Sequence, residues 1–218
     1  APVQNVGAYG QEVSETITSV EAYDLQTGTF TVLDNASCEF AYRDSIFKHD
    51  KRYLITQVTF QLDRVKTVQP PTYASLIAEL ERRGIEQPTA ADIRKAVIAI
   101  RSAKLPDPTK VPTAGSFFHN PIVTAEHFQR IRTSHPDIPH WPTTDGTIKL
   151  AAAWLVEQCG FRGKIENGIG TYEKQALCLI NPGHKPAKEV LAFRDKIITV
   201  VKSEFDVTLQ MEPELISV

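Results

Sequence analysis

The chain has 218 residues, of which 42% are hydrophobic and 23% charged, so it can bury a sizeable core and form one large or two ordinary domains. Its 24 basic and 26 acidic side chains are interspersed and give a formal charge of −2, which argues against a nucleic-acid or membrane-surface partner. The three cysteines lie far apart, which disfavours a disulfide framework or a Cys-x-x-Cys site and favours a reducing cytoplasm.

The N-terminus carries no targeting or membrane-anchoring pattern. It has neither a basic segment followed by an apolar one nor a run long enough to cross a bilayer. The first residue is not Met, and the chain starts inside a Gly-rich stretch. We therefore expect it to be part of a longer protein.

The first third of the chain predicts antiparallel β-structure. Residues 16–25 alternate apolar and polar side chains, residues 26–28 form a turn, and residues 29–33 return as a second strand of a hairpin. Residues 53–62 repeat the alternation and predict a third strand.

Two helices are predicted next. The first covers residues 73–83 and ends at Gly84, and residues 89–92 resemble a capping box that starts the second. The side chains expected to face inward are Leu76, Ile77 and Leu80 in the first helix and Ile93, Val97 and Ile100 in the second.

The remainder of the chain predicts a second domain. Residues 105–112 contain three prolines and are interpreted as a linker. The elements predicted after it are a helix over 147–159 ended by Gly160, a strand over 175–180, a helix over 186–204 and a strand over 207–215. The fold class is α+β, because helices and strands do not alternate as short βαβ units.

The segment from Lys104 to Asn120 is the most informative stretch. Ser116 follows Ala-Gly and precedes two aromatic residues, so the backbone can approach a ligand at Gly115 while the rings exclude water. From the residue types alone a turn serine between two domains is favoured, because Gly, Pro, Asn and Ser are ordinary turn residues.

Two further stretches allow ligand binding. The run Gly7-Ala8-Tyr9-Gly10, preceded by Gln4 and Asn5, offers backbone N–H groups and two amides to a phosphate or flavin ring, although any tight turn would look similar. Tyr42 and Arg43 suit a carboxylate ligand, and a surface salt bridge between Arg43 and Asp44 is the alternative. Residues 212–214, Glu-Pro-Glu, are typical of the solvent-exposed end of a strand.

Dinucleotide and metal sites of the common kinds are not indicated. Residues 168–173 contain Gly-x-Gly without the third glycine or a following helix start, so we predict a loop and no Rossmann fold. His119, His127, His135 and His140 lack the close spacing of zinc ligands, and no metal is predicted.

Six segments in register carry a resemblance to a known family. They are residues 2–10, 42–48, 104–108, 114–121, 145–146 with 149–152, and 212–214. Taken in order, they resemble the UDP-N-acetylenolpyruvoylglucosamine reductase family, flavoenzymes of bacterial peptidoglycan synthesis. Tyr73 and the spacing after Tyr42 suggest the subtype with an extra tyrosine-bearing segment over the substrate.

The resemblance implies a domain arrangement. Residues 1–105 would be the second part of a two-part, non-Rossmann FAD-binding fold of the vanillyl-alcohol-oxidase type. Residues 106–210 would form an α+β substrate-binding domain, and residues 211–218 a strand returning to the flavin side. The N-terminal subdomain that holds the FAD pyrophosphate is expected to be absent from this chain.

The resemblance also implies a reaction. NADPH would reduce FAD, and reduced FAD would deliver hydride from N5 to the enolpyruvyl ether of UDP-N-acetylglucosamine enolpyruvate, giving UDP-N-acetylmuramate. Arg43 would polarise the substrate carboxylate, Glu214 would assist enol stabilisation as an acid, and Ser116 would donate the proton. Residue types alone favour a turn serine at position 116, but the resemblance makes Ser116 the favoured proton donor.

Binding roles follow in the same way. The expected substrate contacts are Tyr42, Tyr73, Lys104, Asn120, Trp141 and Gln175, with Lys104 near phosphate or NADPH. The expected flavin contacts are Gln4, Asn5, Gly7, Ala8, Tyr9 and Gly10. We expect a cytoplasmic monomer. The alternative is a non-catalytic fragment that binds the nucleotide sugar but not FAD; a flavin-dependent oxidase is disfavoured by the Ser116 and Glu214 motifs.

Overall fold

The computed structural model describes residues 1–64, 68 and 71–215, and the chain divides into two compact units, Ala1–Ile100 and Arg101–Val218. The division falls within the helix α3, Ala90–Lys104. Residues 216–218 of the predicted returning strand lie outside the described residues.

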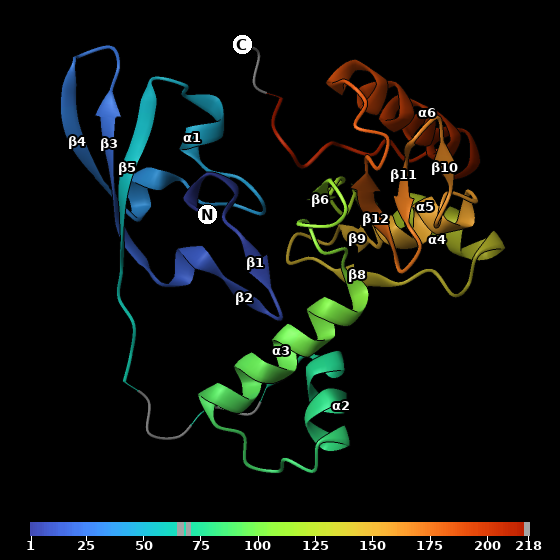
Figure 1. Cartoon of the computed structure of the whole chain (residues 1–218), viewed down its shortest axis with the longest axis horizontal. Coiled ribbons are helices and arrows are strands. Elements are labelled where there is room, and N and C mark those ends of the chain that lie inside the picture. Colours follow the sequence, from blue (N-terminus) through green and yellow to red (C-terminus); the bar gives the residue numbers. More distant parts are fainter. Residues whose placement is uncertain (65–67, 69–70, 216–218) are drawn as a thin grey trace. The chain divides into compact units, whose positions relative to one another are not determined.

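A three-stranded antiparallel sheet dominates the first unit and confirms the predicted hairpin and third strand. The strands β3 (Ile17–Asp24), β4 (Thr29–Asp34) and β5 (Tyr53–Phe60) lie side by side in the order β4-β3-β5 (Figure 1). Along β3 the inward positions Val20 and Ala22 are fully buried, because alternate side chains of a strand point to one face.

Short elements complete the part of this unit that packs on the sheet. Strands β1 (Gly7–Ala8) and β2 (Gln11–Glu12) form a hairpin, and α1 (Ile46–His49) is a single helical turn. Phe47 of α1 is buried in the core of the sheet with Cys38. The 3₁₀ turns are η1 (Pro2–Gln4), η2 (Val13–Glu15) and η3 (Ala36–Cys38).

Helix α2 (Ala74–Arg82) and α3 lie side by side and share a small core of Leu76, Leu80 and Ala96 (Figure 1). The predicted capping box is confirmed: Thr89 N donates to Asp92 Oδ2 (3.1 Å) and Asp92 N to Thr89 Oγ1 (3.2 Å). The inward placement of Ile77 was wrong, because α2 buries only the narrow stripe of Leu76 and Leu80 and leaves Ile77 36% exposed.

The second unit contains two antiparallel sheets. The four-stranded sheet has the order β10-β11-β12-β6, with strands Ile165–Glu166 (β10), Ile169–Tyr172 (β11), Gln175–Ile180 (β12) and Thr113–Ser116 (β6). The three-stranded sheet has the order β7-β9-β8, with strands Ile122–Val123 (β7), Ile148–Leu150 (β9) and His140–Pro142 (β8).

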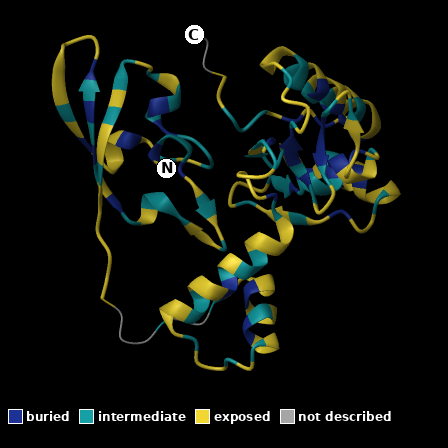
Figure 2. Ribbon diagram, in the orientation of Figure 1, coloured by how far each residue is buried: buried dark blue, intermediate teal, exposed yellow. Residues whose placement is uncertain are grey.

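Three helices cover these sheets: α4 (Ala125–Ser134), α5 (Ala152–Gln158) and α6 (Ala187–Phe205). Helix α5 packs against β12 and α6, and α6 also packs against β11. Ile197 and Val201 of α6 are fully buried together with Leu155 of α5, and Figure 2 shows β11 and β12 as the buried centre of this unit. The predicted strand 175–180 and helix 186–204 are confirmed.

Two of the elements predicted in this unit were wrong in part. Residues 148–150 are strand β9 and not the start of a helix, because they pair with β7 on one side and with β8 on the other. Leu150 is fully buried, and helix α5 begins only at Ala152. Residues 207–215 form a single bridge between Met211 and Phe118 in place of a strand. Two hydrogen bonds support it, from His119 N to the Gln210 oxygen and from Glu212 N to the Phe117 oxygen.

The predicted loop 168–173 is largely strand β11. It is joined to β10 by a two-residue turn, Asn167-Gly168, whose φ angles of 51° and 82° are both positive, as a type I′ turn requires. The Gly-x-Gly spacing therefore belongs to a β-hairpin.

None of the helices in the described part of the chain combines the length and the apolar character that a membrane-spanning helix needs.

Candidate functional site

The N-terminal hairpin β1–β2 turns at Tyr9 and Gly10, whose φ angles of 56° and 80° give the left-handed conformation of a two-residue hairpin turn. Ala8 and Gly10 are exposed. The predicted Gly-rich motif is thus an ordered hairpin with an accessible tip, one of the two possibilities that its residue types allowed.

Arg43 is held against this hairpin by its own guanidinium. Nη2 donates to the Gly7 oxygen (2.6 Å) and Nη1 to the Asn5 oxygen (3.3 Å), while Nη1 lies 3.8 Å from Glu12 Oε1. A Cβ on Gly7 would stand 3.0 Å from Arg43 Nη1. Glycine at position 7 therefore leaves the space that the guanidinium occupies.

Asn5 is the buried centre of the same cluster, with 1% of its surface exposed. Its Nδ2 donates to Glu12 Oε2 (2.8 Å) and to the Ala41 oxygen (2.9 Å), and its Oδ1 accepts from Ser14 N (3.1 Å). These bonds satisfy the buried amide and tie β2 to the segment that precedes Arg43. Asn5 therefore acts here as a structural clamp.

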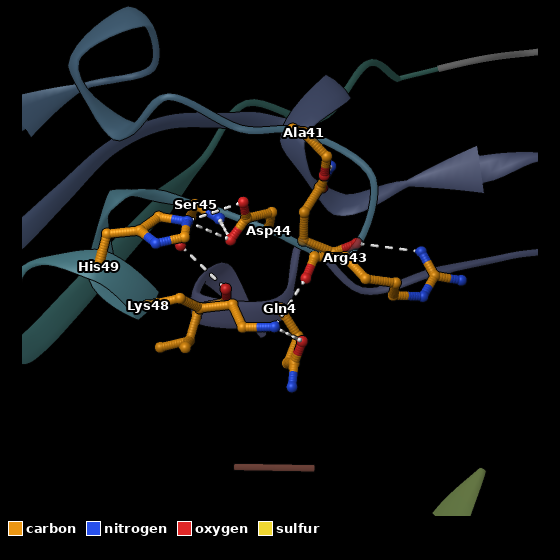
Figure 3. A network of polar contacts seen from close by, with 9 residues as sticks. Gln4, Ala41, Arg43, Asp44, Ser45, Lys48 and His49 are labelled. Atoms are coloured by element: carbon orange, nitrogen blue, oxygen red, sulfur yellow. Dashed lines mark hydrogen bonds and ion pairs between the residues drawn. The ribbon is translucent and has the colours of Figure 1, made fainter. Parts of the chain in front are cut away.

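Lys48 links two of the predicted site residues. Its Nζ donates to Gln4 Oε1 (3.3 Å) and to the backbone oxygen of Arg43 (3.1 Å), and Figure 3 shows both contacts converging on the ammonium. The Arg43 backbone that accepts this bond has a φ of 54°, a left-handed conformation that is uncommon for residues other than glycine.

Asp44 pairs with His49 on the outer side of the cluster (Figure 3). Asp44 Oδ2 lies 2.8 Å from His49 Nε2, and Ser45 N donates to Asp44 Oδ1 (3.0 Å). Burial raises the pKa of Asp44, but the bonds from His49 and Ser45 and the charge of Lys48 outweigh it, so the pKa of Asp44 is lowered. Arg43 itself pairs with Glu12.

Two predicted tyrosines meet beside the hairpin. The rings of Tyr9 and Tyr73 stand edge to face with centroids 5.2 Å apart, and Tyr73 precedes α2 and is 48% exposed. The guanidinium of Arg43 lies 5.2 Å from the ring centroid of Tyr42. The first unit therefore brings Tyr9 of the hairpin against Tyr73 from a distant segment, and it places the Arg43 guanidinium against the ring of its neighbour Tyr42.

Ser116 ends the edge strand β6 of the second unit. It is exposed, whereas the following Phe117 and Phe118 are 4% and 1% exposed. Opposite Ser116 on the neighbouring strand lies Cys178, which is 1% exposed. An exposed hydroxyl thus sits at the rim of a closely packed aromatic core.

The cations Arg101 and Lys104 lie near this strand pair. Burial raises the pKa of the Cys178 thiol to about 11, and the positive charges of Lys104 and Arg101 act in the opposite direction. Lys104 is exposed at the end of α3. At Cys178 the effect of burial is the larger one, so the thiol stays protonated despite these two cations.

The other predicted substrate contacts lie at separate places in the second unit. Asn120 Oδ1 accepts from Ala152 N (3.0 Å) and so caps α5, while Trp141 lies on β8 and is 51% exposed. Gln175 begins β12, where its Oε1 accepts from Leu177 N (3.3 Å). Glu214 is exposed in the C-terminal segment.

The predicted catalytic residues belong to different units: Arg43 to the first, and Ser116 and Glu214 to the second. Within the first unit Gln4, Asn5, Gly7 and Arg43 form one polar cluster. Glu12 and Lys48 belong to it as well, although neither was a predicted site residue. The contact from Lys48 to Gln4 spans 44 positions, so no local pattern could have revealed it.

Apart from the carboxylate of Glu12, the cluster is rich in N–H donors, which come from side-chain amides, a guanidinium and an ammonium. Such a set suits a ligand with carbonyl or anionic oxygens. Among the described residues there is no grouping of three or more His, Cys, Asp or Glu side chains that could hold a metal ion.

Comparison with known proteins identifies the family. The family profile described as UDP-N-acetylenolpyruvoylglucosamine reductase, C-terminal domain, matches residues 107–216. The reductase of that name from Azoarcus sp. is 45% identical over 98% of this chain and 61% of its own length. The one from Cupriavidus pinatubonensis is 47% identical over 98% of this chain and 63% of its own length.

Comparison with solved structures finds a similar fold. The UDP-N-acetylenolpyruvylglucosamine reductase (MurB) of Thermus caldophilus aligns with a TM-score of 0.58 at 20% identity, covering 98% of this chain and 58% of that one. The mixed α/β architecture is therefore shared. The chain spans 61–64% of the length of the curated relatives. It belongs to the UDP-N-acetylenolpyruvoylglucosamine reductase family.

Proposed function

We propose that the protein is an NADPH-dependent flavoprotein reductase that converts UDP-N-acetylglucosamine enolpyruvate to UDP-N-acetylmuramate. The observation that carries the proposal is the extent of the similarity. Relatives named for this reductase are 42–47% identical over 98–99% of the chain, so the likeness covers both units and not only residues 107–216.

In this proposal residues 1–105 are the second part of a two-part FAD-binding domain and residues 106–210 the substrate-binding domain. The first part of the FAD-binding domain would come from sequence outside this chain.

The donor set around the hairpin fits a flavin. The polar edge of an isoalloxazine ring presents carbonyl oxygens and ring nitrogens that accept hydrogen bonds, and Gln4 with the accessible Ala8–Gly10 tip supplies N–H donors. When bound and reduced by NADPH, FAD would supply hydride to the enolpyruvyl ether. The remaining flavin contacts in this proposal are Gly7 and Tyr9. Asn5, whose amide is engaged by Glu12, Ala41 and Ser14, would support the hairpin and not touch the flavin.

Three residues carry the rest of the chemistry. Addition of hydride places negative charge on the substrate carboxylate and its neighbouring carbon, so the carboxylate needs a cation and the carbon needs a proton. Arg43 supplies the cation, Ser116 the proton, and Glu214 assists enol stabilisation as an acid. Because a serine hydroxyl is a weak acid, neighbouring groups must lower the cost of its transient alkoxide.

The nucleotide-sugar part of the substrate would meet a second group of residues. Asn120 would offer its Nδ2 to phosphate, because its Oδ1 accepts from Ala152 N and the nitrogen is the donor of the amide. Lys104 would add positive charge for phosphate or NADPH. The other substrate contacts in this proposal are Tyr42, Tyr73, Trp141 and Gln175.

The test compares the two half-reactions in the natural full-length protein. Ser116→Ala should leave NADPH-dependent flavin reduction nearly unchanged and slow flavin reoxidation by the enolpyruvyl sugar by about 10²–10⁴-fold. Ser102→Ala, an exposed serine on α3, is the control and should leave both rates unchanged. Equal slowing of both half-reactions in Ser116→Ala would show that the serine is not the proton donor.

A second measurement asks what the 218-residue chain does by itself. If the purified chain retains the visible absorbance of flavin, it binds FAD without the first part of the FAD-binding domain. A colourless chain that still binds the enolpyruvyl sugar would be the non-catalytic nucleotide-sugar-binding piece.

A further inference from the structure

We propose that Lys48 is a positioning residue that orients Gln4 toward the flavin and holds the Arg43 backbone in its left-handed conformation. This role rests on the proposed function, because it deepens the account of that same site. The observation behind this proposal is that the Lys48 ammonium donates hydrogen bonds to both Gln4 and Arg43, which lie 39 positions apart and have different proposed roles.

The contact to Gln4 determines which end of the amide faces a ligand. Lys48 can only donate, so the amide oxygen must face its ammonium, and the observed Oε1 to Nζ distance is 3.3 Å. The amide is planar, and its nitrogen therefore points to the other side, as Figure 3 shows. Gln4 is thereby set as a donor, which matches the acceptor atoms of a flavin edge.

The contact to Arg43 acts on the backbone. A left-handed φ of 54° is unfavourable for a residue with a Cβ, and the 3.1 Å bond from Lys48 Nζ to the Arg43 oxygen helps to stabilise it. That backbone conformation directs the side chain to Gly7 and Asn5. Loss of Lys48 should therefore displace the guanidinium without removing it.

The position of Lys48 itself is secured by its helical turn. Lys48 follows Phe47, which is 5% exposed and lies in the core of the sheet. Ser45, on the other side of Phe47, donates from Oγ to the oxygen of Val3 in η1 (2.9 Å). These contacts hold α1 and the Gln4 segment together even without the ammonium. The variant Lys48→Met should therefore fold, with its aliphatic stem retained.

The experiment uses the natural full-length protein loaded with FAD. Lys48→Met should raise the flavin dissociation constant by about tenfold and slow reoxidation by the enolpyruvyl sugar by about 10–100-fold, the scale of a misplaced catalytic group. Lys48→Arg, which keeps a donor and a positive charge, should recover most of both losses. Lys95→Met, an exposed lysine on α3, is the matched control and should change neither.

A double-mutant cycle separates positioning from general support of the fold. In the Gln4→Ala background, Lys48→Met should change the flavin dissociation constant of the apoprotein by less than about twofold, because the group that it orients is gone. Fully additive effects would overturn the positioning role. So would a Lys48→Met protein that matches wild type, or one that Lys48→Arg does not rescue.

The wild-type protein provides the remaining distinction. If it binds no flavin, the proposed function fails, and the role of Lys48 that rests on it fails as well. If wild type binds flavin and reduces the enolpyruvyl sugar while Lys48→Met is unaffected, only the role of Lys48 is wrong.

Discussion

Arg43 occupies the space that a side chain at Gly7 would need: its Nη2 donates to the Gly7 oxygen at 2.6 Å, and a Cβ on Gly7 would lie 3.0 Å from its Nη1. The same Cβ would lie 3.0 Å from the Gln11 oxygen and from Glu12 Cγ. The identity of residue 7 is therefore coupled to the placement of the guanidinium.

Gly7→Ala should displace Arg43 and destabilise the protein by about 1–3 kcal/mol, the usual cost of overpacking. Flavin reoxidation by the enolpyruvyl sugar should slow by about tenfold or more, because the cation for the carboxylate moves. Denaturant unfolding and the second half-reaction measure the two effects. Ala91→Ser, at an exposed position on α3, should match wild type. A Gly7→Ala protein with wild-type rates would show that Arg43 tolerates the displacement.

Arg43→Lys should be poorly tolerated although it keeps the charge. The guanidinium donates through two nitrogens, to Gly7 and to Asn5, and a single ammonium cannot reproduce that planar fork. We expect flavin reoxidation to fall by about 10²-fold and NADPH-dependent flavin reduction to change little. Stopped-flow absorbance of the flavin resolves the two rates. Turnover at the wild-type level would remove Arg43 from the mechanism.

Gly170→Ala should be among the most damaging single changes in the second unit. A Cβ there would stand 2.2 Å from the Lys164 oxygen, a backbone atom held by the β10–β11 hairpin. The expected loss exceeds about 3 kcal/mol in the free energy of unfolding. Gly146→Ala is the control: nothing lies within 4 Å, so only its positive φ of 82° opposes the change, at about 1–2 kcal/mol. Similar losses in the two variants would contradict the steric explanation.

Glu79 should make the stability of the α2–α3 pair depend on pH. Hydrogen bonds from Arg82 and Arg83 lower the pKa of Glu79 from 4.5 to about 2. A carboxyl with a lowered pKa stabilises the folded state fully above its unfolded pKa, and that contribution disappears as the pH falls toward 2. Glu79→Gln should therefore melt below wild type at pH 7, and the two should converge near pH 2. A difference in melting temperature that does not change with pH would contradict this ion-pair role.

The cysteines should be unreactive in the folded protein. Burial raises the pKa of Cys38, Cys159 and Cys178 to about 11, so little thiolate is present at pH 8. Alkylation by iodoacetamide should be about 100-fold slower than in denaturant, as the thiolate fraction requires. Mass spectrometry of the alkylated protein measures it. Rapid modification of Cys178 in the native state would show that the β12–β6 edge opens.

Local patterns in the sequence predicted the elements that local forces control. The alternation in residues 16–25 identified β3, the reciprocal bonds of Thr89 and Asp92 started α3, and Gly160, with a φ of 74°, ended α5. The Asn167-Gly168 turn was readable in the same way, since Asn-Gly favours a type I′ hairpin. The interpretation of Gly168 and Gly170 as an incomplete dinucleotide motif instead predicts a loop at this position.

The errors fall where long-range pairing outweighs local preference. Residues 148–150 have a helical pattern with the residues that follow, yet pairing with β7 and β8 makes them a strand. Residues 207–209 bury Val207 and Leu209 in the core of the second unit without pairing as a strand. Burial of apolar side chains determines both outcomes, and no local window contains that information.

The sequence by itself determined the family, the main helices and the three-stranded sheet, and it named Arg43, Ser116 and Glu214 as candidates. Only the tertiary structure placed Arg43 against Gly7 and Lys48 between Gln4 and Arg43. The residues joined in these contacts are up to 44 positions apart. Hydrogen bonds of this kind form only when the folded backbone brings donor and acceptor within about 3 Å, which the local propensities of their neighbours do not specify.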